Sequence, residues 1–318
     1  MKPGFLVLLV ALASATCAEA AAPIPPTLTN LPPPDSATYG QVRARNMRPP
    51  RETERYRLLR KSSPDNLFAR TVAGDHEAVG ISFLSGSTYV GIEGWNVIYA
   101  AKDFVLQIPQ TADAASEQFL YAPTARPPNG SCLELGTAYE TLPGKPTEVS
   151  LYAFDFCTAQ GVFLRWTPFD DVLLNMYTRR DGTNRLYYFR IIPDNMAVSA
   201  STKWTAELFN FQKNRWDQFA SAQGESTDPR GWSIFETYFQ PGQCSKSLPL
   251  LFASTIEVLD ATTGAWKKVD FGDSLFVSTY DSSGPSAYCF RADHTGPASY
   301  LFSLVAEKAG WAVSSTGF

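Results

Sequence analysis

The amino-acid sequence predicts an all-β protein built as one large β-sandwich or barrel. Beyond residue 75 the chain consists of short apolar and aromatic runs in which apolar and polar residues alternate, as they do in half-buried strands. Gly, Pro, Asn and Asp bound these runs, and few windows have the period of a helix. About 240 residues of evenly spaced strands suit one sandwich or barrel better than two domains.

Individual strands are expected where the alternation is clearest. Seven runs have it: 78–84, 104–108, 149–156, 185–192, 204–211, 256–259 and 275–280. Two longer segments, 206–216 and 256–266, each contain a strand, a polar turn and a Trp on the return strand, which predicts two β-hairpins. Their turns should lie near 212–214 and 262–264.

The first 20 residues are typical of a secretory signal peptide. Lys2 is followed by the apolar run 5–13 and then by the small-residue pattern Ala18-Glu19-Ala20. This apolar stretch is too short to span a membrane, and the prolines that follow it would stop a buried helix. Cys17 offers a lipoprotein alternative, but the residue three positions before it is not apolar. We therefore expect residues 1–20 to be removed and the protein to be secreted.

Charge and proline content divide the rest of the chain into segments. Residues 21–42 are rich in proline and small polar residues, as linkers are. The stretch 43–70 holds nine Lys or Arg and three acidic residues, whereas 71–318 holds 17 basic and 26 acidic residues. This asymmetry fits a basic pro-segment over 43–75 that lies against an acidic sandwich domain over 76–318. It fits equally an exposed basic arm that has no partner.

The cysteines predict disulfide bonds. Four remain once the signal peptide is removed: Cys132, Cys157, Cys244 and Cys289. An even number in an exported chain favours disulfides, although four cysteines allow three connectivities. We predict the pairs Cys132–Cys157 and Cys244–Cys289, which both join neighbours in sequence. A zinc site is a poor alternative, because the chain has no C-x-x-C pair and only two histidines, so we expect no metal and no cofactor.

Most standard catalytic motifs are absent from the sequence. It has no G-x-S-x-G elbow, no H-E-x-x-H, no P-loop and no Gly-rich dinucleotide fingerprint. A Ser-His-Asp or Cys-His enzyme would have to depend on His294, since His76 lies at the edge of the expected pro-segment. Carboxylates are the remaining candidates for acid-base chemistry.

Two glutamates are distinguished by their surroundings. Glu134 lies between Leu133 and Leu135, so a strand would direct both leucines to one face and the carboxylate to the other. Glu236 lies in Gly231-Trp-Ser-Ile-Phe-Glu-Thr-Tyr-Phe239, where a lone acid is costly to desolvate. If both are buried, one carboxyl can stay neutral and donate a proton while the other accepts one. Alternation alone favours a plainer arrangement, in which both glutamates face solvent.

A resemblance to a known family supports the catalytic interpretation. The segment Gly231-Trp-Ser-Ile-Phe-Glu236 resembles the Trp-ringed strand that bears the catalytic Glu of eqolisin-type glutamic peptidases. The apolar run 248–258 that follows it resembles the next strand of those enzymes. The segment Leu133-Glu-Leu-Gly136, followed by 151–156, resembles the strand with the catalytic Gln and the aromatic strand after it. Glu134 occupies the place of that Gln, which is a departure. The similar neprosin-type enzymes use two glutamates, so the change need not abolish activity.

The resemblance implies a fold and an activity. The fold would be a concanavalin-like antiparallel double-sheet β-sandwich, a jelly roll. The activity would be that of a secreted endopeptidase that acts at acid pH after loss of its basic pro-segment. Glu134 and Glu236 would be the catalytic pair, facing each other across one sheet, and Trp232, Tyr152 and Phe154 would bind a polypeptide substrate. We expect a monomer without a cofactor.

Two other function classes remain open. A carbohydrate-binding module or glycosidase on the same fold would stack sugar rings on exposed aromatics, and Trp95, Trp166, Trp204 and Trp216 are available. Two glutamates would also serve glycoside hydrolysis, although the E-x-D-x-x-E strand of sandwich glycosidases is absent. A non-catalytic extracellular protein is the third class, because fold does not fix function.

Few other features of the chain carry chemistry. Asn129-Gly-Ser131 is an N-glycosylation sequon, which would matter only in a eukaryotic host. Arg179-Arg-Asp-Gly-Thr183 is most simply a hairpin turn with solvated charges. No stretch after the signal peptide is apolar over the length that crosses a bilayer. We expect neither a membrane nor a nucleic-acid partner.

Overall fold

The computed structural model describes nine stretches of the chain, all within one compact unit, 33–318. They are residues 77–83, 87–104, 118–141, 146–158, 161–238, 248–269, 274–278, 300–305 and 309–315. The predicted signal peptide, linker and pro-segment lie outside the described residues, and so do Cys244 and Cys289. Within the nine stretches, no helix is both long and apolar enough to cross a membrane.

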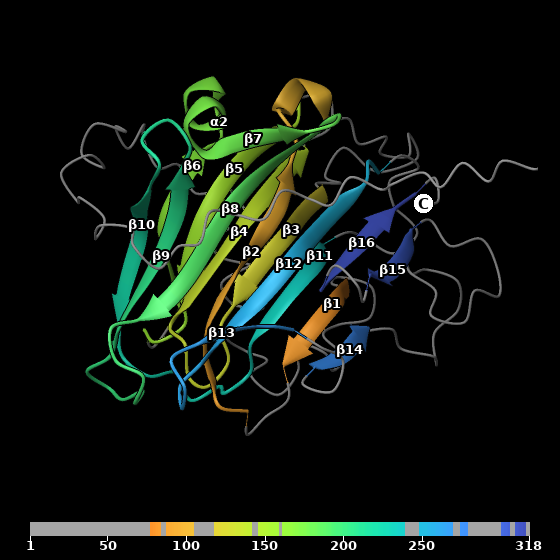
Figure 1. Ribbon diagram of the computed structural model, residues 1–318. Coiled ribbons are helices and arrows are strands. Elements are labelled where there is room, and N and C mark those ends of the chain that lie inside the picture. Colours follow the sequence, from red (N-terminus) through yellow and green to blue (C-terminus); the bar gives the residue numbers. More distant parts are fainter. Residues whose placement is uncertain are drawn as a thin grey trace, which may run out of the picture. The chain divides into compact units, whose positions relative to one another are not determined.

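Two antiparallel β-sheets form the described fold (Figure 1), which confirms the predicted β-sandwich. The first, sheet A, has the strand order β14-β1-β11-β3-β4-β5-β6. Its strands are β1 (Glu77–Phe83), β3 (Gln118–Arg126), β4 (Leu133–Thr141), β5 (Glu148–Asp155), β6 (Val162–Pro168), β11 (Trp232–Tyr238) and β14 (Ser274–Ser278).

The second sheet, sheet B, has the order β10-β9-β8-β2-β12-β16-β15, with β7 paired to β8 and β13 paired to β12. Its strands are β2 (Tyr89–Ile98), β7 (Thr178–Asp181), β8 (Asn184–Pro193), β9 (Lys203–Asn210), β10 (Arg215–Gln223), β12 (Leu251–Asp260), β13 (Trp266–Lys268), β15 (Leu301–Val305) and β16 (Gly310–Ser314). A 3-10 turn, η3 (Ala101–Asp103), and a short helix, α2 (Asp171–Tyr177), complete the described elements.

The strands lie largely where the alternation predicts them. Six of the seven predicted runs coincide with β1, β5, β8, β9, β12 and β14. In the seventh, Phe104 follows the 3-10 turn instead of starting a strand, and the rest lies outside the described residues. The predicted hairpins are confirmed as β9–β10, β12–β13 and β7–β8. Helix α2 was not predicted; its N-cap, Asp170, accepts hydrogen bonds from two backbone N–H groups of the first turn.

Alternate residues of each strand fill the interior between the sheets. The Thr137 hydroxyl on β4 lies 3.0 Å from the Tyr187 hydroxyl on β8. Trp311 on β16 donates its indole N–H to Ser233 on β11 at 3.0 Å. These cross-sheet contacts identify the inner face of sheet A. Because successive residues of a strand point to opposite faces, Glu134 points to the other, outer face.

The outer face of sheet A also carries Glu236. Where the register between β11 and β3 shifts, β11 advances by two residues, from Ile234 to Glu236, while its partners on β3 change by three, from Thr124 to Tyr121. The extra residue therefore lies in β3, and β11 keeps its alternation. Trp232, Ile234 and Glu236 consequently share the face opposite Ser233.

Candidate active site

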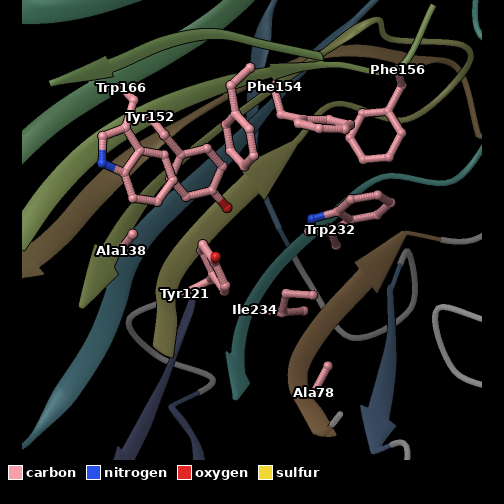
Figure 2. Packing of buried hydrophobic residues seen from close by; sticks show 10 residues of the cluster. Ala78, Tyr121, Ala138, Tyr152, Phe154, Phe156, Trp166, Trp232 and Ile234 are labelled. Carbon is pink, nitrogen blue, oxygen red and sulfur yellow. The ribbon is translucent and has the colours of Figure 1, made fainter. Parts of the chain in front are cut away.

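An aromatic cluster lies on the outer face of sheet A around the candidate glutamates (Figure 2). Its ten buried members come from β1, β3, β4, β5, β6, β11 or their ends, and are Ala78, Tyr121, Ala138, Tyr152, Phe154, Phe156, Phe163, Trp166, Trp232 and Ile234. The Tyr152 ring stacks on Trp166 with centroids 5.6 Å apart. A carboxyl on this face lies among apolar side chains, where charge is costly unless it is hydrogen-bonded.

Glu134, near the start of β4, is fully buried and accepts hydrogen bonds at both carboxylate oxygens. The Tyr152 hydroxyl donates to Oε1 at 2.6 Å, and Trp232 Nε1 donates to Oε2 at 3.2 Å. Figure 2 shows the Tyr152 hydroxyl and the Trp232 indole nitrogen directed toward the space between them. The two oxygens of the carboxyl thus each have a hydrogen-bond donor.

A glycine leaves the space that this contact needs. Gly136 is directly opposite Tyr152 in the register of β4 and β5. A Cβ atom at Gly136 would lie 2.8 Å from the Tyr152 hydroxyl oxygen. Any side chain at position 136 would therefore push the phenol away from Glu134. The glycine of the Leu133-Glu-Leu-Gly136 segment thus has a packing role that the sequence pattern alone did not identify.

Glu236 on β11 is also fully buried. It pairs with Ala78 of β1 and Tyr121 of β3, so the two glutamates flank β3. The two glutamates are offset along the strand direction. Across β3, Glu134 lies beside Trp232, which is four residues before Glu236 on β11. With strands about 4.8 Å apart and a rise of about 3.3 Å per residue, the two Cα atoms are about 16 Å apart. The two carboxyls are therefore not in direct contact.

The three predicted substrate-binding residues lie beside Glu134. Tyr152 and Trp232 contact its carboxylate, and Phe154 is directly opposite it in the β4–β5 register. Phe154 meets Phe163 edge to face, with centroids 5.0 Å apart. The structure brings these side chains together around one carboxylate.

Sequence reasoning missed Arg126, the last residue of β3. It is fully buried, and its guanidinium carbon lies 4.4 Å from the Phe156 ring centroid and 5.0 Å from that of Trp232. Burial lowers the pKa of Arg126 to about 10, while the charges of Asp228 and Glu134 act in the opposite direction. The available signal was an arginine at the end of an otherwise uncharged strand.

A disulfide ties the ends of β4 and β5 next to Glu134. Cys132 and Cys157 are joined, with Cα atoms 5.0 Å apart, which confirms this predicted pair. The predicted Cys244–Cys289 pair lies outside the described residues. Across the described stretches, the one group of potential metal ligands is Cys132, Asp155 and Cys157, and the disulfide occupies both of its sulfur atoms.

A further buried carboxyl lies on the outer face of sheet B. Glu93 on β2 is 2% exposed and accepts a hydrogen bond from the Tyr188 hydroxyl at 2.7 Å. It is directly opposite Glu257 on β12 and Arg190 on β8. Burial raises the pKa of Glu93 to about 7; the Glu257 charge adds to this effect and the Tyr188 hydrogen bond opposes it. Sequence reasoning did not single out this carboxyl.

The four tryptophans available to a carbohydrate-binding surface are buried, with at most 7% exposed. Trp166 belongs to the aromatic cluster of sheet A. Trp95 and Trp216 lie on sheet B, with ring centroids 4.8 and 5.1 Å from that of Tyr188. The Trp204 indole donates to a backbone carbonyl at 3.0 Å. None of the four offers an exposed platform for a sugar ring.

The glycosylation sequon is engaged in the fold. The Asn129 amide donates to the backbone carbonyls of Ser87 and Tyr89 at 2.6 and 2.7 Å. Its backbone has φ of 59°, a left-handed conformation that asparagine tolerates. Both amide protons are thus used inside the folded protein.

Fold and site together define a two-sheet antiparallel β-sandwich with a carboxyl-bearing aromatic face. No protein family and no curated protein matches the sequence. Similar solved structures include scytalido-glutamic peptidase with a peptide-based transition-state analogue, at TM-score 0.40 and 9% identity. They also include the same peptidase with a transition-state analogue inhibitor, at TM-score 0.39 and 11% identity. Each alignment covers 77% of this chain and 100% of the other. The case for a function rests on the geometry of the two carboxyls.

Proposed function

We propose that this protein is a secreted glutamic-type endopeptidase that acts at acid pH through Glu134 and Glu236. The observation that carries the proposal is the burial of both carboxyls on one face of sheet A, on either side of β3. Aromatic side chains surround them, and Glu134 is placed between a phenol and an indole donor. Acid-base hydrolysis needs two carboxyls whose surroundings differ, so that one gives a proton and the other takes one.

Glu134 is the general base in this mechanism. Tyr152 and Trp232 each donate to one oxygen of this carboxylate, and in the proposed mechanism a water molecule binds beside them. Glu134 removes a proton from that water as the water oxygen bonds to the carbonyl carbon of the peptide. The two donors fix the orientation of the carboxylate during this step.

Glu236 is the general acid. Its neighbours on the adjacent strands are Ala78 and Tyr121, and in the proposed mechanism it is the carboxyl that holds the proton. As the C–N bond of the peptide breaks, the proton of Glu236 moves to the leaving nitrogen. Glu134 then releases its proton to solvent and Glu236 takes one up from solvent, which returns the pair to its starting state.

We also propose that residues 43–75 block this site until they are removed. Strand β1 begins at Glu77, and Ala78 pairs with Glu236, so the basic segment joins the sandwich next to the candidate acid. Its positive charge is opposite to the net negative charge of residues 71–318. Acidification should release it, because protonated carboxyls no longer attract arginines.

The test is a substrate panel. Purified secreted protein is incubated with denatured protein and with several polysaccharides, from acid to neutral pH, beside Glu134→Gln and Glu236→Gln variants. Glu148→Gln on β5 is the matched control, because its side chain is exposed. We expect peptide cleavage at acid pH that both site variants lose and the control keeps, with unchanged circular dichroism. Glycan cleavage without proteolysis, or proteolysis that survives both site substitutions, would refute the proposal.

A further inference from the structure

We propose that Arg126 is a positioning residue of the candidate site, which holds the Trp232 indole against Glu134 and balances the negative charge of Glu134. The inference rests on the proposed function, because it assigns a role in that site. Arg126 does not touch the substrate in this scheme. It acts through Trp232 and through its own charge.

The guanidinium of Arg126 is fixed by two loops. Nε and Nη2 donate to the backbone carbonyl of Ser131 at 3.1 and 2.8 Å, and Nη2 also donates to that of Asp228 at 3.0 Å. Ser131 belongs to the loop that enters β4, and Asp228 to the loop that enters β11. The planar guanidinium thus joins the entry points of the two strands that carry the candidate glutamates.

The same guanidinium lies between two aromatic rings of the site. Its central carbon is 4.4 Å from the Phe156 centroid and 5.0 Å from the Trp232 centroid. The indole that it contacts donates to Glu134 at 3.2 Å. Cation–π contacts of a desolvated arginine restrict the ring, so Arg126 controls the position of the donor that Glu134 uses.

Charge balance gives Arg126 its second effect. Arg126 Nη1 lies 3.2 Å from an Asp228 oxygen, and Asp228 also accepts from Arg230 at 2.8 and 2.9 Å. Two cations therefore offset two anions, Asp228 and Glu134, and loss of Arg126 leaves one cation. Its pKa of about 10 keeps Arg126 charged from acid to neutral pH. Within the described stretches, the titratable or charged groups near Glu134 include Arg126 on β3, Tyr152 on β5, Glu236 on β11 and, in the adjoining loop, Asp228 and Arg230.

Arg190 on sheet B offers a matched control. Its guanidinium carbon lies 4.4 Å from the Trp216 centroid, and it forms an ion pair with Glu207. Arg190→Met therefore removes a tryptophan contact and an ion pair of the same kind, at the other sheet. A general loss of packing should affect both arginine variants alike.

The experiment compares Arg126→Met, Arg126→Lys and Arg190→Met in the secreted protein after acidification. Two quantities are measured: kcat/KM against pH, and the indole N–H resonance of Trp232 in protein labelled with ¹⁵N-tryptophan, assigned with Trp232→Phe. For Arg126→Met we expect a fall in kcat/KM on the order of 100-fold, as for a displaced catalytic group. We also expect the acid limb of the curve of kcat/KM against pH to move to higher pH, and the indole N–H resonance of Trp232 to shift. Arg126→Lys should keep the acid limb of the wild type while losing part of the rate.

The outcomes separate this inference from the proposed function. If the protein cleaves no peptide but Arg126→Met alone shifts the Trp232 resonance, the positioning role stands and the peptidase proposal fails. If peptide is cleaved and Arg126→Met matches Arg190→Met in both the pH profile and the Trp232 resonance, the positioning role is wrong. Should the methionine variant fail to fold, Arg126→Lys decides: an unchanged kcat/KM and an unchanged Trp232 resonance would overturn the inference.

Discussion

Glu93 should make the folding stability of this protein depend on pH, and the perturbation that isolates it is Glu93→Gln. The side chain is 2% exposed, and burial raises its pKa from an ordinary value of 4.5 to about 7. A difference of this size corresponds to about 3 kcal/mol of unfolding free energy. Glutamine has nearly the same shape and can still accept the hydrogen bond from Tyr188, so the variant removes the titration and keeps the contact.

The sign follows from proton binding. The folded protein binds the Glu93 proton more tightly than the unfolded chain does, so the stabilisation is fully present below about pH 4.5. It is lost as the pH rises toward about 7. Glu257 lies directly opposite Glu93 in the register of β2 and β12. Glu257→Gln should therefore weaken the pH dependence, since the Glu257 charge raises the pKa of Glu93.

The effect is measured by urea unfolding at a series of pH values between 4 and about 8. The proteins compared are the wild type, Glu93→Gln and the exposed control Glu148→Gln. As the pH rises across this range, the unfolding free energy of the wild type and of the control should fall by about 3 kcal/mol more than that of Glu93→Gln. Equal slopes for the wild type and Glu93→Gln would refute the reasoning, because the buried carboxyl would then not titrate in this window.

Further expected outcomes concern covalent structure, the Glu134 contact and processing. Replacement of Cys132 and Cys157 by alanine should lower the unfolding free energy by about 3 kcal/mol, and an unchanged urea midpoint would contradict this. After expression in a eukaryotic host, peptide mapping should find Asn129 without a glycan, because its amide is bound in the fold; high occupancy would show that the site is accessible before folding. Tyr152→Phe should lower kcat/KM by about 10- to 100-fold, while urea unfolding shows a stability loss of about 1 to 3 kcal/mol. An unchanged rate would exclude a role for the phenol. N-terminal sequencing of active secreted protein should find a start between residues 60 and 80, and a start at residue 21 would contradict the pro-segment.

The strands could be predicted because their signal is local. Alternation in the runs around Tyr188 and Phe209 is visible within eight residues, and it fixes which side chains share a face. Turn residues mark the hairpins in the same way. The position of Glu134 on the face opposite Leu133 and Leu135 follows from this rule alone.

The surroundings of the glutamates could not be predicted in this way. Alternation assigns a polar residue to the outer face and then favours solvent exposure, yet Glu134 and Glu236 are fully buried there. The reason is that the outer face of sheet A carries an aromatic cluster of its own, so both faces of the sheet are apolar. The contact between Trp232 and Glu134 joins residues 98 positions apart, and no local pattern contains such a pairing. Arg126 and Glu93 were missed for the same reason.

The two sheets carry similar groups on their outer faces, and their differences separate two roles. Each face has a glutamate, a tyrosine that donates to it, and an arginine stacked on a tryptophan: Glu134, Tyr152, Arg126 and Trp232 on sheet A, and Glu93, Tyr188, Arg190 and Trp216 on sheet B. On sheet A a second donor reaches the carboxylate, whereas on sheet B a second carboxyl, Glu257, faces it. A neighbouring carboxyl favours a retained proton. The two donors therefore hold the Glu134 carboxylate in place, while Glu93 keeps its proton in acid solution and stabilises the fold under the conditions in which the proposed peptidase would work.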